Sequence, residues 1–196
     1  MVKGWHGWVG TFTGVALVTV AVLPLAALAV WVLARRRRRT GTTSAWRMSL
    51  AEVGIVYGTV PWVWMIMLPG GRADAVPGRV SLVPLQDLLT IFASGPLRAT
   101  GQVVGNLLVF AALGFFAPVR FAALASLPRI LALAAGCSVL VEAAQYVLRL
   151  DRVSSVDDVL LNAAGAGLAA LASRRWWRAT ARASSDRPRS APVLGR

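Results

Sequence analysis

Histidine, cysteine and acidic side chains are all scarce in this chain. It contains one His, one Cys and eight Asp and Glu residues among 196. A single cysteine excludes an intramolecular disulfide and a CxxC pair, and one histidine beside it does not complete a zinc site. The polar residues described below are not accompanied by a Gly-rich phosphate loop either. We therefore expect neither a metal nor a cofactor.

Charge is scarce as well, and apolar residues take its place. Charged residues form 15% of the chain, whereas a soluble domain carries about 25%. Apolar residues form 57%, and about 20 of them in a row span a bilayer. Five such runs occupy residues 8–33, 49–68, 103–119, 130–148 and 156–173. The sequence thus predicts an all-α fold, a polytopic helical bundle with about five transmembrane helices, multi-pass in the cell membrane.

The chain is strongly basic, with a formal charge of +13. Its Lys and Arg residues lie beside the apolar runs and do not alternate with aromatic residues on a polar domain, so we expect no nucleic-acid partner. With the N-terminus outside, 15 of the 21 basic residues fall on the cytoplasmic side and six on the outer side. The positive-inside rule therefore predicts an N-out, C-in topology.

Three parts follow from this topology. Residues 1–48 form an N-terminal transmembrane helix with a basic cytoplasmic linker, 49–173 form a helical membrane domain, and 174–196 form a disordered basic cytoplasmic tail. The arginines at 35–39 hold the end of the first span in the cytoplasm, which favours a retained helix over a cleaved signal peptide. Segment 81–97 is interrupted by proline and too short to span, so we expect it at the outer interface.

Polar side chains gather near the outer ends of the last three spans. The candidate binding residues are Asn106, Glu142, Gln145, Arg149, Arg152, Asp158 and Asn162. Glu142, Gln145 and Arg149 are spaced to share one helical face, and Asp158 and Asn162 share another. At about 1.5 Å per residue, Glu142 and Asn162 lie at similar depth in the membrane. Polar groups at that depth are costly unless partnered, so the cluster indicates a functional site.

The fifth span has a clear helix start. Ser154 or Ser155 is the candidate N-cap, and Asp157 and Asp158 lie in the first turn, where the helix dipole favours carboxylates. Further along, Gly165 belongs to a stripe of small residues of the kind that lets transmembrane helices approach closely. We expect this stripe to face the fourth span.

Two interpretations of the polar cluster stay open. In the first, Glu142 and Asp158 pair with Arg149 or Arg152 in a buried clasp that only fixes the helical hairpin. In the second, the cluster opens toward the outer leaflet as a pocket for a phosphate- or glycan-bearing lipid. Arginine would then supply bidentate contacts to phosphate.

Three motifs follow one another in the second half of the chain. They are N-L-L-V-F-x-x-L-G-F at 106–115, E-x-x-Q at 142–145 and R-x-x-S-x-D-D-x-x-x-N-x-x-G at 152–165. In this order they resemble the VanZ-like membrane proteins over residues 80–173. The resemblance implies a small multi-pass protein of the cell envelope, in a family named after a member linked to resistance to teicoplanin.

Three classes of function remain open at this point. A binding protein would hold a membrane lipid, or a lipid-linked or glycan precursor of the cell wall, at these residues. An enzyme acting on a lipid-linked substrate would use Glu142 and Asp158 as acid and base, since two carboxylates in different environments can divide those roles. A noncatalytic helical scaffold would need the cluster only for packing. A transporter is disfavoured, because the five spans show no internal repeat.

Overall fold

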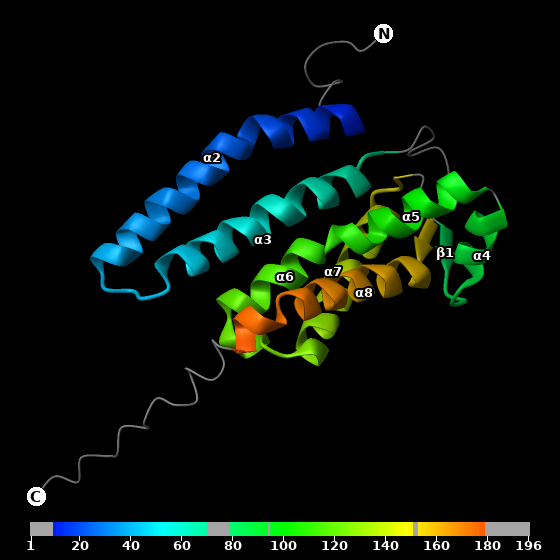
Figure 1. Cartoon of the computed structure of the whole chain (residues 1–196). Helices are drawn as coiled ribbons and strands as arrows, with labels where there is room; N and C mark the ends of the chain where they lie inside the picture. The colour runs from blue at the N-terminus through cyan, green and yellow to red at the C-terminus, as the bar shows by residue number, and fades with distance from the viewer. Residues whose placement is uncertain (1–9, 70–78, 94, 151–152, 179–196) are drawn as a thin grey trace, which may run out of the picture.

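The computed structural model describes residues 10–69, 79–93, 95–150 and 153–178, and helices dominate these stretches (Figure 1). In chain order the elements are α2 (Phe12–Arg39), α3 (Ala45–Ile66), β1 (Arg79–Ser81), α4 (Gln86–Ala93), α5 (Pro96–Val109), α6 (Ala111–Arg120), a 3-10 turn η1 (Ala122–Leu124), α7 (Leu127–Val147), β2 (Val153–Ser155) and α8 (Val156–Ala172). The two strands are three residues each. The prediction of an all-α fold is therefore confirmed.

Within the described residues, four helical segments are long and apolar enough to cross a membrane. They are α2, α3, the stretch Pro96–Arg120 formed by α5 and α6, and α7. Helix α8 is the fifth expected span, and its 17 residues lie at the short end of the range of about 17–25. The third span begins earlier than the apolar run at 103, because Pro96 at the first helical turn starts α5 there. Phe110 then interrupts the helix and separates α5 from α6.

Helix α2 runs along the side of α3, at the edge of the bundle (Figure 1). It continues through the arginine run, which places Arg37 beside Glu52 of α3. One Glu52 oxygen lies 2.5 Å from Nη2 of Arg37, and the other lies 2.5 Å from Nε of Arg120 on α6. Glu52 thus joins α2, α3 and α6 at this end through two ion pairs.

Helix α8 packs against α5, α6 and α7. A Cβ on Gly114 of α6 would overlap the backbone of Ala166, and a Cβ on Gly165 would overlap the backbone of Leu107 on α5. The glycines therefore allow α8 to approach α5 and α6 closely. The expectation that the Gly165 stripe faces the fourth span was wrong. Two residues along a helix turn by about 200°, so it is Gly167, on the opposite face, that meets leucine side chains of α7.

The two ends of the bundle differ in chemistry. The arginines at the end of α2 and those that follow α8 lie at the same end of the bundle (Figure 1). Arg47 of α3 donates a hydrogen bond of 2.8 Å there, to the carbonyl of Trp176. Trp177 is buried there, and its indole N–H donates to the carbonyl of Ala170 at 2.9 Å. The opposite end holds α4, the strands and the first turns of α5 and α8.

The strands form a small parallel ladder that the hydrophobic pattern does not predict. Val80 pairs with Ser154, and the ladder continues one residue to each side. It brings segment 79–81 against the start of α8 and leads directly into α4. The segment expected at the outer interface is thus a strand followed by a short helix, and Leu82, Leu89 and Phe92 on it are exposed.

Candidate functional site

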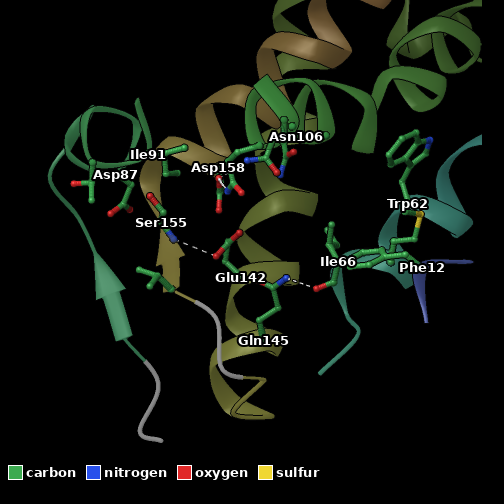
Figure 2. A pocket seen from close by; sticks show the side chains of 17 residues that line it. Phe12, Trp62, Ile66, Asp87, Ile91, Asn106, Glu142, Gln145, Ser155 and Asp158 are labelled. Atoms are coloured by element: carbon green, nitrogen blue, oxygen red, sulfur yellow. Dashed lines mark hydrogen bonds between the residues drawn. The ribbon is translucent and has the colours of Figure 1, made fainter. Parts of the chain in front are cut away.

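A cavity of about 600 Å³ lies at the end of the bundle opposite to the arginines (Figure 2). Its apolar wall comes from α2 and α3 and consists of Phe12, Trp62, Met65 and Ile66. Its polar wall comes from α4, α5, α7, β2 and α8 and consists mainly of Asp87, Thr90, Gln102, Asn106, Glu142, Gln145, Ser155, Asp158 and Asn162. Five of the seven candidate residues from the sequence therefore line one cavity.

Asp158 is held at the cavity by two side-chain amides of α5. Its Oδ1 accepts hydrogen bonds from Nδ2 of Asn106 and from Nε2 of Gln102, the latter at 3.2 Å. These bonds tie α8 to α5 beside the close contact at Gly165. Gln102 was not among the predicted residues, although it stands four positions before Asn106. That helical spacing places both amides on one face of α5 and would have identified it.

Glu142 and Gln145 connect α7 to its neighbours, as the dashed lines in Figure 2 show. Oε2 of Glu142 accepts from the backbone N–H of Ser155 at 3.1 Å. Nε2 of Gln145 donates to the carbonyl of Ile66, at the end of α3, at 2.8 Å. Ser155 is the N-cap of α8, because its hydroxyl accepts from the N–H of Asp157. The serine start predicted for this helix is confirmed.

Asp157 has a role that its position in the first turn of α8 does not reveal. Its carboxylate is 1% exposed and accepts N–H bonds from Leu85 at 2.6 Å and from Asp87 and Leu88 at 3.1 Å. These N–H groups belong to the start of α4. The first N–H groups of a helix have no acceptor within the helix itself. No residue of α4 is buried, so Asp157 anchors a helix that supplies Asp87 and Thr90 to the cavity.

Two oxygens of the polar wall are buried and have no hydrogen-bond partner among the residues that the structure describes. They are Oδ2 of Asp87 and Oδ1 of Asn162. Asn162 is 2% exposed, and its amide nitrogen donates to Oγ of Ser138 at 2.7 Å. A buried acceptor without a donor costs about 1–3 kcal/mol, so the wall is suited to a molecule that donates hydrogen bonds.

Arg149 does not line the cavity, although it was predicted to share the face of Glu142 and Gln145. Helix α7 ends at Val147, and Arg149 adopts a left-handed backbone conformation with φ of 50°. The helical face therefore ends before Arg149, and its side chain is exposed. Arg152, the other predicted basic residue, lies outside the described residues. None of the described lining residues is Lys or Arg.

Gly101 and Gly105 give α5 a smooth surface toward the cavity. Both line it, and nothing lies within 4 Å of the position that a Cβ would take on either residue. A Cβ at either position would therefore meet no protein atom. This contrasts with Gly165, where the space is already taken by backbone.

The chain was compared with protein families, with curated proteins and with solved structures. The family model described as VanZ/LLP1 matches residues 55–177, which is more than half of the chain. The chain belongs to the VanZ-like family. Neither the curated proteins nor the solved structures contain a match to it. The VanZ-like region begins within α3, so it extends further toward the N-terminus than the resemblance over 80–173.

The motifs of this VanZ-like protein divide between packing and the cavity. Gly114 and Gly165 let α6 and α5 approach α8. Asn106, Glu142 and Asp158 line the cavity. Helix α2 lies wholly outside the family match, although its first residue, Phe12, contributes to the apolar wall.

Proposed function

We propose that this VanZ-like membrane protein binds the polar headgroup of a lipid-linked or cell-wall precursor in the cavity. The two walls support the proposal, because an apolar side suits a hydrocarbon chain and a polar side suits a headgroup. The observation that carries it is the pair of buried oxygens, Oδ2 of Asp87 and Oδ1 of Asn162, which receive no hydrogen bond from any part of the chain that the structure describes. A site needed only for packing would satisfy such atoms within the protein, which weighs against a pure scaffold.

The proposal places the cavity in the outer leaflet. The arginine-rich end of the bundle is opposite to the cavity, and basic segments stay in the cytoplasm. A reporter active only in the cytoplasm should therefore work when fused after Arg178 and fail when inserted at Asp151. The reverse pattern of reporter activity would move the cavity to the cytoplasmic leaflet and contradict this part of the proposal.

Gly105→Trp should remove the bound molecule and leave the bundle folded. Space is open at this position, and replacing a helical glycine relieves a helix-propensity cost of about 1 kcal/mol relative to Ala. The measurement is the amount of lipid that copurifies with each variant in detergent, determined by mass spectrometry beside thermal unfolding. We expect the wild type to retain a specific lipid that Gly105→Trp loses.

Gly136→Trp is the matched control for this experiment. Gly136 lies on an exposed face of α7, also with nothing within 4 Å of its Cβ position, and does not line the cavity. The Gly136→Trp variant should retain the lipid that the wild type carries. A folded Gly105→Trp variant carrying the same lipid in the same amount would refute binding in the cavity.

An acid–base enzyme is the second candidate, because Glu142 and Asp158 line the same cavity. The binding proposal expects the copurified molecule to be chemically unchanged after long incubation with the protein, whereas an enzyme would convert it. Reduced susceptibility to teicoplanin-type glycopeptides is the cellular part of the proposal. Any such effect of the wild type should disappear with Gly105→Trp and persist with Gly136→Trp.

A further inference from the structure

The polar wall of the cavity is rich in acceptors and negative charge. Asp87 and Asp158 both line it, and none of the described lining residues is Lys or Arg. Asp158 accepts hydrogen bonds from two neutral side-chain amides, and both bonds end on its Oδ1. Neither amide supplies the positive charge that would balance a carboxylate in a poorly hydrated site.

Two further acceptors point to a donor that is not part of the protein. Oδ2 of Asp87 and Oδ1 of Asn162 are buried, and no described residue donates a hydrogen bond to either; Asn162 is 2% exposed. Asp87 comes from α4 and Asn162 from α8, so the unsatisfied acceptors belong to two different elements around one space. A ligand group with several N–H donors would reach acceptors on both elements.

We infer that the headgroup bound in the cavity carries a primary ammonium group, which Asp87, Asp158 and Asn162 receive. This inference rests on the proposed function and names the chemistry of its ligand. An ammonium group combines a positive charge with three donors, and hydrogen bonds between charged groups are stronger than neutral ones.

Other headgroups fit these residues less well. A phosphate would place its negative charge beside Asp87 and Asp158, which repels it. A quaternary ammonium has no N–H to donate and is usually held by a cage of aromatic rings, whereas the aromatic lining here is Phe12 and Trp62 on the apolar wall. Within the described residues, no group of three His, Cys, Asp or Glu side chains is placed to hold a metal ion.

The experiment compares probes that share a dodecyl chain and differ in headgroup. Dodecylammonium, dodecyltrimethylammonium, dodecanol and dodecyl phosphate are titrated into the purified full-length protein in an uncharged detergent, and calorimetry measures the affinity. Gly105→Trp is the baseline for partition into the micelle. We expect dodecylammonium to bind at least about tenfold more tightly than the other three, since a hydrogen bond to a charged group contributes enough for that ratio.

Isosteric variants test the named carboxylate. Asp158→Asn should lower the affinity for dodecylammonium about tenfold or more and leave the affinity for dodecanol unchanged. Glu52→Gln removes the same charge at the opposite end of the bundle, where Glu52 contacts Arg37 and Arg120. It should leave both affinities unchanged, and thermal unfolding verifies that each variant is folded.

The outcomes separate the inference from the proposed function. Equal affinity for dodecanol and dodecylammonium, both lost in Gly105→Trp, would overturn the ammonium headgroup while the cavity remains a binding site. A preference for dodecyl phosphate would overturn it in the same way. Ethanolammonium, which has no hydrocarbon chain, should bind more weakly than dodecylammonium. Equal affinities would show that the ligand is a soluble amine and not a lipid. If none of the probes binds the wild type more tightly than Gly105→Trp, both the inference and the proposed function fail.

Discussion

Gly165→Leu is expected to abolish the recovery of folded protein. Even the Cβ of the new side chain would overlap the backbone of Leu107, and neither main chain can move without separating α8 from α5. Overpacking in a well-packed core costs about 1–3 kcal/mol and sometimes more. Here the clash is with backbone, so we expect the upper end of that range or beyond. Size-exclusion profiles and thermal unfolding in detergent provide the measurement.

Gly136→Leu is the control for this prediction. It makes the same substitution in the middle of α7, at an exposed glycine with nothing within 4 Å of its Cβ position. Its unfolding temperature should be equal to or above that of the wild type, because Leu is the better helix former. A Gly165→Leu variant as stable as Gly136→Leu would show that α5 and α8 are not in close contact.

Asp157→Ala is expected to release α4 while the rest of the bundle stays folded. The substitution removes the acceptor of three backbone N–H groups, at Leu85, Asp87 and Leu88. Hydrogen bonds to a charged group contribute about 1.5–3 kcal/mol each, and α4 has no buried residue to compensate for their loss. Amide hydrogen exchange over 85–93 should therefore become about a hundredfold faster or more.

The amides of α7 are the internal control in the same experiment, because the three hydrogen bonds to the Asp157 carboxylate come from residues 85–88. Their exchange rates should change little. Asp157→Asn keeps one acceptor oxygen and should give an intermediate effect on α4. Unchanged protection of α4 in Asp157→Ala would show that another interaction anchors this helix.

The membrane helices and much of the cavity lining could be predicted from the sequence because both follow from short-range patterns. An apolar run of sufficient length predicts a span wherever it occurs. Depth along the helices places Glu142 and Asn162 at one level, helical periodicity places Gln145 on the face of Glu142, and all three line the cavity. The residue at which a helix ends is harder to predict. Arg149 was expected in the cavity because the helical face of Glu142 was continued to residue 149, whereas α7 ends at Val147.

The anchoring of α4 could not be predicted in the same way. Asp157 is 72 residues from Leu85, and no local spacing connects them. The first turn of α8 is itself a favourable place for a carboxylate, so the sequence offers a sufficient local explanation for Asp157. The true partners become visible only when the parallel ladder brings the two segments together. The same argument applies to Gly165, whose small size indicates a close contact without indicating which helix it contacts.

The separation between these two segments also sets an order of events during synthesis. A ribosome adds about 5–20 residues per second, so roughly 4–14 s pass between the emergence of Leu85 and that of Asp157, 72 residues later. During this time α4 has no cap, and its exposed Leu89 and Phe92 are accessible to insertion factors and proteases. The cavity is thus completed only once the first half of α8 has been made. A nascent chain stalled before α8 would contain all four described helical segments of membrane-spanning length and would lack Asp158 and Asn162 of the polar wall.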